Sequence, residues 1–124
     1  MLYKRKDQHE QLCVIRVSTD VLDLPGVVIA DCNASSDRVR FGAAADALAR
    51  LDREEVFAEW WTHEDDPIAE LRHKSKKCAE VLVPDVVEPR LIIGAYVSCV
   101  STRAPLTALA PSLTVTLNAH LFFR

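Results

Sequence analysis

The residues with the clearest chemical potential are a run of cations and the carboxylate that follows it. Glu80 comes after a stretch of six residues that carries four positive charges, on Arg72, Lys74, Lys76 and Lys77. Lysine and arginine gain most of their affinity for nucleic acid from phosphate contacts. The run could therefore hold a phosphate-bearing partner beside a potential base. A solvated edge of the fold is the alternative, and the net charge of −3 favours it because there is no global basic footprint.

The position of Glu80 in its apolar segment decides whether its carboxylate could do chemistry. Strand alternation places its side chain on the face opposite that of Ala79 and Val81. On a cleft wall the carboxylate could abstract a proton, whereas on a solvent face it would be ordinary. No second carboxylate lies at short spacing, so a paired-carboxylate glycosidase is not indicated. The three glycines of the chain form no phosphate-binding loop.

The cysteines indicate neither a metal site nor an exported protein. Cys13, Cys32, Cys78 and Cys99 are 19, 46 and 21 residues apart, with no CxxC spacing, so we expect no metal. We expect reduced, buried thiols in a cytoplasmic protein, most clearly at Cys13 and Cys99, which lie in apolar runs. No stretch approaches the roughly 20 apolar residues of a membrane span, so no membrane partner is expected.

The elements before the basic run are predicted as two strands and three helices. Residues 11–17 and 27–30 have the composition of strands. Apolar residues at helical spacing predict a helix over 36–51, with Phe41 in the core. Asp52 with Glu55 three residues later has the spacing of a capping box and predicts a second helix. The buried face of that helix is expected to consist of Val56, Phe57, Trp60 and Trp61. Pro67 begins a third helix, with Ile68 and Leu71 as its apolar face.

The elements after the basic run are mainly strands. Residues 78–83, 91–97 and 113–117 are predicted strands, and Ser101 is predicted to cap a short helix that ends at Leu109. Strands, then helices, then strands favour an α+β class with antiparallel or mixed pairing. No linker or repeat divides the chain, so we expect a single domain over residues 1–124.

Three stretches carry a resemblance to a known family. They are the opening MLY, residues 29–34 (IADCNA) and residues 74–84 (KSKKCAEVLVP), and they resemble the DarT-type DNA ADP-ribosyltransferase toxins, which are paired with macrodomain antitoxins. The third stretch is the most specific, because in that family a basic segment runs into an Ala-Glu-aromatic-Leu-Val strand. Trp60-Trp61 and the aromatic end at 121–123 (LFF) also look similar.

The resemblance implies a fold, a reaction and partners. The fold is an ADP-ribosyltransferase-like core with a split mixed or antiparallel sheet and helices. The reaction is transfer of ADP-ribose from NAD⁺ to a base, thymidine in the commoner branch, in single-stranded DNA, with a macrodomain antitoxin as the protein partner. Glu80 matches the catalytic strand glutamate, which could remove the ring proton of the base and stabilise the cationic ribose.

The remaining site residues follow from the same resemblance. Lys74, Lys76 and Lys77 are expected in or beside the loop that holds the DNA backbone. Asn33 matches a position near the substrate, which implies a DNA-contact or positioning role. Position 81 is Val where an aromatic residue is usual.

The chain departs from the family's pattern at its start. In the family, Met-Leu-Tyr is internal and follows a His-containing strand that grips NAD⁺ and an arginine that contacts it. Arg5, Arg16 and His9 do not match those positions. We therefore expect an N-terminally truncated, incomplete transferase domain. It would lack the N-terminal part of the NAD-binding half, have no assigned NAD-binding residue, and be weakly active or inactive alone.

Two other hypotheses stay open. The first is a non-catalytic module of the same origin that binds single-stranded nucleic acid or a protein partner. The second is a plain interaction or structural domain. Salt-sensitive oligonucleotide binding through the three lysines would separate the DNA hypotheses from the last one.

Overall fold

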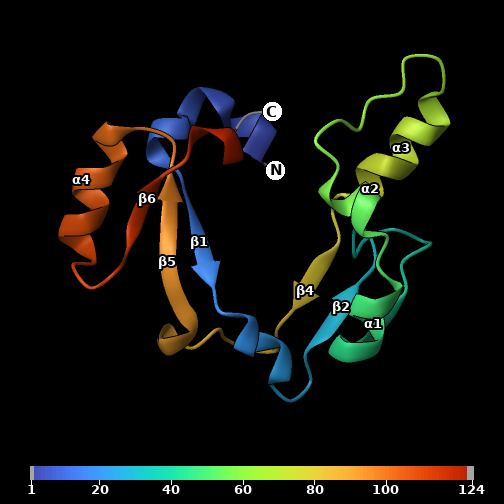
Figure 1. Ribbon diagram of the computed structural model, residues 1–124, viewed down its shortest axis with the longest axis horizontal. Helices are drawn as coiled ribbons and strands as arrows, with labels where there is room; N and C mark the ends of the chain where they lie inside the picture. The colour runs from blue at the N-terminus through green and yellow to red at the C-terminus, as the bar shows by residue number, and fades with distance from the viewer. Residues whose placement is uncertain (1, 123–124) are drawn as a thin grey trace. The chain divides into compact units, whose positions relative to one another are not determined.

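The computed structural model describes residues 2–122, with side chains from residue 7 onward, in two compact units. Residues 2–19 and 87–122 belong to the first unit, and residues 20–86 to the second. Each unit contains one three-stranded sheet with helices (Figure 1). The predicted α+β class with mixed and antiparallel pairing is confirmed. The single-domain assignment stays a prediction.

The sheet of the first unit is mixed. Its central strand β5 (Ile92–Val97) pairs antiparallel with β1 (Cys13–Val17) and parallel with β6 (Val115–Leu117). A parallel neighbour needs a crossover, which α4 (Val100–Leu109) provides (Figure 1). Ala95 and Val97 on β5 are fully buried and form the centre of this unit's core. All three strands were predicted. The sequence did not predict the 3₁₀ segments of this unit, which are η1 (Leu2–Gln11), η3 (Pro89–Leu91) and η4 (Ala119–Leu121).

The start of α4 differs from the prediction. Cys99, not Ser101, is the N-cap residue, with an extended backbone at φ −148° and ψ 165°. Ser101 lies in the first turn, where its hydroxyl is 3.0 Å from the Cys99 sulfur. The assignment of Ser101 as the cap was wrong because the chain passes from β5 into the helix within two residues, which leaves Ser101 already inside it.

The sheet of the second unit is antiparallel throughout. β2 (Val28–Ala30) lies between β3 (Phe41–Ala43) and β4 (Glu80–Leu82), after the short 3₁₀ segment η2 (Thr19–Asp23). Ile29 and Ala30 of this central strand are almost completely buried, as the apolar run at 27–30 predicted. The predicted strand at 78–83 is also confirmed, over a shorter range.

The helix predicted over residues 36–51 is only partly present. Residues 41–43 form β3, and α1 covers only Ala44–Arg50. Phe41 was assigned to the core, but it is 52% exposed. The helical spacing misled because the backbone of this segment finds a better partner in β2, whose Ala30 pairs with Phe41. Long-range pairing, which the local sequence does not reveal, overrode the local pattern.

The two helices that follow begin where they were predicted. α2 (Arg53–Phe57) is capped by Asp52, whose carboxylate accepts a hydrogen bond from the Glu55 backbone N–H at 3.1 Å. α3 (Pro67–Lys76) is capped by Asp66, which accepts hydrogen bonds from Ile68 N and Ala69 N at 3.0 and 2.9 Å. Both caps satisfy backbone donors that have no partner inside the helix.

The burial predicted for these helices is wrong. Phe57 and Trp60 are 78% and 76% exposed, and both tryptophans lie beyond the end of α2 at Phe57. Ile68 and Leu71 on α3 are 64% and 69% exposed, whereas His73 is the buried residue of that helix. An apolar stripe predicts which face would be buried, but not whether another element covers it.

The cysteines are free thiols, but their burial was predicted correctly only for Cys32. Cys13 and Cys78 are exposed and Cys99 is half-buried. Cys13 is exposed because it opens β1, the strand at the edge of its sheet. Among residues 2–122 there is no group of three or more His, Cys, Asp and Glu side chains placed to hold a metal ion. No helix in that range is long and apolar enough to cross a bilayer.

Candidate functional site

Glu80 opens β4, where strand pairing sets it opposite Ala30 of β2. Its side chain is exposed, and Oε1 accepts a hydrogen bond from the Ala34 backbone N–H with an N–O distance of 3.4 Å. A contact of that length is weak. It is the only hydrogen bond that the described residues give this carboxylate. Glu80 is therefore held in place by its strand while its carboxylate stays available to a substrate.

Asn33 organises the loop that follows β2. Its Oδ1 accepts hydrogen bonds from the Ser35 backbone N–H and hydroxyl, at 3.0 and 2.7 Å. Its own backbone N–H donates to the Ser75 carbonyl oxygen at 3.0 Å. These contacts place the Ala34 N–H beside Glu80 and tie the loop to the end of α3. The DNA-contact or positioning role expected of Asn33 stays a prediction.

The three lysines of the basic run make different contacts. The Lys74 ammonium lies 5.5 Å from the centre of the Trp61 ring. Lys76 forms ion pairs with Glu55 and with Asp52 Oδ2, the latter at 3.4 Å. Lys77 donates a hydrogen bond to the Ala58 carbonyl oxygen. Two of the three predicted DNA ligands are therefore already bound within the chain.

The ion pairs at Lys76 also shift the pKa values of its network. The hydrogen bond that Lys76 donates to the Glu55 carboxylate raises the pKa of Lys76 above its ordinary value. The Glu55 backbone N–H, followed by smaller side-chain contributions, lowers the pKa of Asp52. Both shifts favour the charged forms, which are the forms that attract each other.

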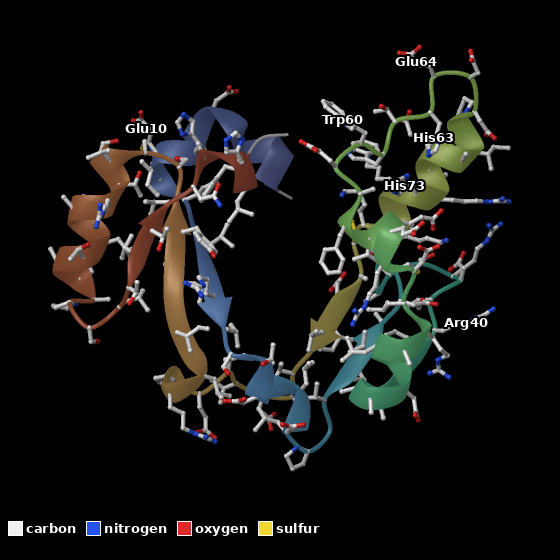
Figure 2. The ribbon with its side chains drawn as sticks, in the orientation of Figure 1. Glu10, Arg40, Trp60, His63, Glu64 and His73 are labelled. Carbon is white, nitrogen blue, oxygen red and sulfur yellow. The ribbon has the colours of Figure 1, made fainter. Side chains whose placement is uncertain are left out.

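A groove of about 1010 Å³ lies in the second unit between the 31–40 loop and α3. Its lining has three carboxylates and six cations, the latter being Arg38, Arg40, Arg50, Arg72, Lys74 and Lys76. We call it the cationic groove, and Arg40, one of its lining residues, is labelled in Figure 2. Ile68 and Leu71 add exposed apolar surface to the same lining. A groove with six cations suits the phosphates of a single nucleic-acid strand.

Three of these cations were missed as site residues from the sequence. Arg38, Arg40 and Arg50 come from a segment that was predicted as one continuous helix. Pairing of β2 with both β3 and β4 is what brings that segment near the basic run. The alternation Arg38-Val39-Arg40 was the one local signal that could have indicated an extended, cation-bearing stretch.

The cationic groove and Glu80 are neighbours rather than one cavity. Asn33 and Cys78 line the groove, but Glu80 is absent from the lining found among the described residues. The Ala34 N–H, one residue beyond Asn33, is the link between the two. The loop after β2 therefore contributes both to the groove lining and to the one hydrogen bond of the Glu80 carboxylate found among the described residues.

A pair of histidines holds the chain between α2 and α3. His63 Nε2 lies 3.1 Å from His73 Nδ1, and His73 Nε2 donates to the Glu55 carbonyl oxygen at 3.0 Å. Figure 2 shows His63 and His73 pointing toward each other, with Trp60 on the same stretch of chain. This contact anchors residues 58–66 to the buried face of α3.

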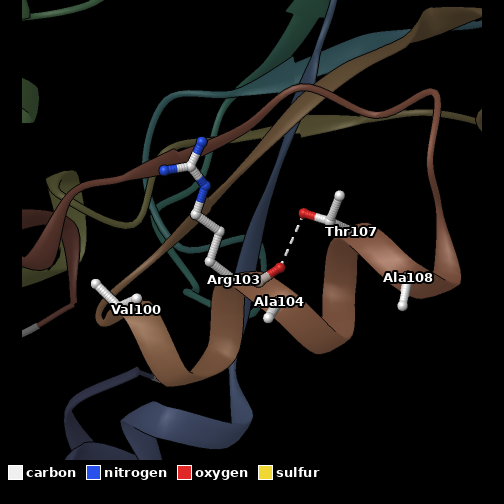
Figure 3. A pocket seen from close by; sticks show the side chains of 5 residues that line it. All are labelled: Val100, Arg103, Ala104, Thr107 and Ala108. Atoms are coloured by element: carbon white, nitrogen blue, oxygen red, sulfur yellow. Dashed lines mark hydrogen bonds between the residues drawn. The ribbon is translucent and has the colours of Figure 1, made fainter.

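A smaller hollow, of about 490 Å³, lies in the first unit along one side of α4 (Figure 3). The side chains that line it are mostly small and apolar, and Arg103 is the one charged residue among them. Thr107 donates its hydroxyl hydrogen to the Arg103 carbonyl oxygen at 2.9 Å. The hollow therefore offers neither an acid–base pair nor a cluster of cations.

Comparisons with solved structures agree on the fold. Thermosipho africanus DarTG in complex with ADP-ribose is 24% identical with a TM-score of 0.76, over 99% of this chain and 33% of the other. Thermus sp. 2.9 DarT in complex with NAD⁺ is 24% identical with a TM-score of 0.65, over 78% of this chain and 49% of the other. The same DarT in complex with ADP-ribosylated ssDNA is 23% identical with a TM-score of 0.70, over 86% and 52%.

The chain thus spans about a third to a half of the length of these proteins. No curated protein matches it. The sequence profile described as "ssDNA thymidine ADP-ribosyltransferase, DarT" matches residues 1–122, which is nearly the whole chain. The chain therefore belongs to the DarT family of ssDNA thymidine ADP-ribosyltransferases.

Proposed function

We propose that this chain carries the DNA-facing part of a transferase that moves ADP-ribose from NAD⁺ to thymidine in single-stranded DNA. Glu80 is its catalytic carboxylate. The observation that carries the proposal is the placement of Glu80, exposed and weakly bonded, one hydrogen bond away from the loop that lines the cationic groove. Membership of the DarT family supports the same reaction.

The chemistry asked of Glu80 is proton removal and charge stabilisation. The carboxylate takes the ring N–H proton of the thymine, and the freed nitrogen forms a bond to C1′ of the ribose as the bond to nicotinamide breaks. Positive charge grows on that ribose as nicotinamide leaves, and a nearby carboxylate stabilises it. A general base of this kind contributes about a hundredfold to ten-thousandfold to the rate.

The cationic groove supplies the seat for the DNA. Six cations against three carboxylates give it a positive balance, although the chain as a whole carries −3. Phosphate contacts position a strand without reading its sequence. Lys74, Asn33 and the groove arginines are the residues proposed to hold the strand so that a thymine reaches Glu80.

NAD⁺ and the protein partner enter only as proposals. No residue of this chain is assigned to hold NAD⁺. The N-terminal truncation stays a prediction, and so do the incomplete NAD⁺ site and the little or no activity expected of the 124 residues alone. A macrodomain antitoxin is the proposed partner, because the likeness to Thermosipho africanus DarTG supports a toxin–antitoxin pair.

The test is transfer of label from isotopically labelled NAD⁺ to a thymidine-containing single-stranded oligonucleotide. The 124-residue chain and the longest chain that its reading frame encodes are compared. We expect transfer by the longer form, and Glu80→Gln to reduce it by at least about a hundredfold. Glu54→Gln is the matched control, because Glu54 is exposed and without a partner among the described residues. Transfer at the control rate by the Glu80 variant would refute the proposal.

A non-catalytic binding module is the second candidate function. The specific observation in its favour is that the cationic groove lies wholly within residues 31–78 and needs no second substrate to bind a strand. A binding module would bind the oligonucleotide equally well after Glu80→Gln. No form of the chain would then transfer ADP-ribose.

A further inference from the structure

Lys76 connects the end of α3 to the start of α2 through two ion pairs. It is the last residue of α3, and its ammonium faces two carboxylates, Asp52 and Glu55. Asp52 also accepts the Glu55 backbone N–H at 3.1 Å, so the cap of α2 and the ion pairs share one carboxylate. The Lys76 side chain is 41% exposed, which leaves it partly shielded from solvent. One ammonium thus ties together two helix ends.

Other contacts from the last turn of α3 hold the same segment. Lys77 donates to the Ala58 carbonyl oxygen, immediately after α2 ends. The buried His73 donates to the Glu55 carbonyl oxygen at 3.0 Å. Residues 52–58 are therefore held against α3 by several contacts.

The arginines of the cationic groove, unlike Lys76, have side chains that are not engaged in ion pairs or hydrogen bonds with the described residues. Arg38, Arg40, Arg50 and Arg72 are exposed, and their guanidinium groups make no hydrogen bond or ion pair with any described residue. A phosphate can bind them without breaking an existing contact. At Lys76, by contrast, a phosphate would compete with Asp52 and Glu55 for an ammonium that is already paired.

We propose that Lys76 is a positioning residue that clamps α2 onto α3 at the rim of the cationic groove, and that the groove arginines make the phosphate contacts. The inference rests on the proposed binding of single-stranded DNA and divides that binding between two kinds of cation. Lys76 thereby shapes the groove without neutralising the strand.

The two roles differ in their salt dependence. Binding of a fluorescein-labelled single-stranded oligonucleotide is measured by anisotropy over a range of salt concentrations. Arg40→Gln and Arg72→Gln are each expected to lower the slope of log affinity against log salt by about 0.7, the value for one lost phosphate contact on a single strand. Lys76→Gln is expected to weaken binding about twofold to fivefold, as for a lost ion pair, with an unchanged slope. Arg53→Gln, an exposed arginine outside the groove lining, is the control.

The clamp has its own readouts. Lys76→Arg, which keeps the charge, should retain affinity, and the charge swap Lys76→Glu with Glu55→Lys should restore most of what Lys76→Glu alone loses. Amide hydrogen exchange at Val56, whose N–H donates to the Asp52 carbonyl oxygen at 2.9 Å, should be faster in Lys76→Gln and return toward the original rate in the swap.

Each result has a definite consequence. A slope change in Lys76→Gln equal to that of the arginine variants would overturn the division of roles, and unchanged exchange at Val56 would overturn the clamp. Absence of oligonucleotide binding by the unaltered chain would overturn the phosphate role of the arginines. Loss of transfer with binding intact bears only on Glu80, so the two proposals fail separately.

Discussion

Glu80 and Asp52 are both exposed carboxylates of the second unit, yet only Asp52 is committed to the fold. Asp52 caps α2 and pairs with Lys76, and the Glu55 backbone N–H holds its pKa below the ordinary value. Glu80 has one long contact, to the Ala34 N–H at 3.4 Å. A carboxylate with so few contacts can serve a substrate, and the hydrogen bond to the loop that lines the cationic groove distinguishes Glu80 from other exposed carboxylates such as Glu54.

Cys99 gives a prediction at the same scale. The Ser101 and Thr102 hydroxyls lie 3.0 and 3.1 Å from its sulfur, and these hydrogen bonds, Ser101's being the largest cause, lower its pKa to about 7. Because a lowered pKa favours the thiolate, alkylation of Cys99 by iodoacetamide should reach half its maximal rate near pH 7. Ser101→Ala should move that midpoint upward, toward 9.0.

Peptide mass spectrometry separates Cys99 from Cys13 and Cys78, which are exposed and also react. A midpoint near 9.0 in the unaltered chain, or no movement in Ser101→Ala, would contradict the assignment of the hydroxyls as the cause.

α3 is the element on which the site depends most. Its first turn is fixed by Asp66, and its last turn carries the contacts to α2 and to the loop after β2. Asp66→Ala removes acceptors for the Ile68 and Ala69 N–H groups, so we expect it to lower the free energy of unfolding by about 1 kcal/mol in urea titrations.

Asp65→Ala is the matched control for that loss. Asp65 is the adjacent exposed carboxylate and makes no hydrogen bond or ion pair with the residues described. Its replacement should leave the free energy of unfolding nearly unchanged. Equal losses in the two variants would show that the cap contributes nothing specific.

Local signals predicted where α2 and α3 begin better than which of their side chains are buried. The Asp52 cap followed from the spacing to Glu55 and the start of α3 from Pro67, because helix starts depend on residues within a few positions. The helix predicted over residues 36–51 was wrong at its start because residues 41–43 pair with β2, which lies outside the segment that carries the helical spacing. The exposure of Phe57 and Trp60 depends on whether another element covers them, which no local pattern contains.

The same contrast holds for the site. Glu80 and Asn33 were identified through the resemblance of short stretches, and antiparallel pairing of β2 with β4 is what makes them neighbours. Lys76 and Lys77 were assigned to DNA through the same resemblance, but the sequence could not show that Glu55 and Ala58 engage them.

At the scale of the whole molecule, net charge conceals where binding can occur. Residues 52–70 carry eight acidic residues against one basic residue, and they account for the overall −3. The cations gather instead on the groove. The groove therefore has a positive local balance, on which the proposed DNA binding depends, although the molecule as a whole is acidic.

Exposed apolar side chains predict self-association of the 124-residue chain. Phe57, Trp60, Ile68 and Leu71 in the second unit are all more than 60% exposed. Apolar surface of this kind favours association. Sedimentation velocity should show species whose average mass rises with protein concentration, and Phe57→Ser with Trp60→Ser should reduce that rise. A monomer at every concentration would contradict this expectation.

The most direct test of the central claim is mass spectrometry of a thymidine-containing single-stranded oligonucleotide incubated with NAD⁺ and the longest chain that the reading frame encodes. The assignment of Glu80 predicts a product heavier by one ADP-ribose on a thymine, formed by the unaltered protein and by Glu54→Gln but not by Glu80→Gln. The same product formed by Glu80→Gln at the rate of Glu54→Gln would contradict it.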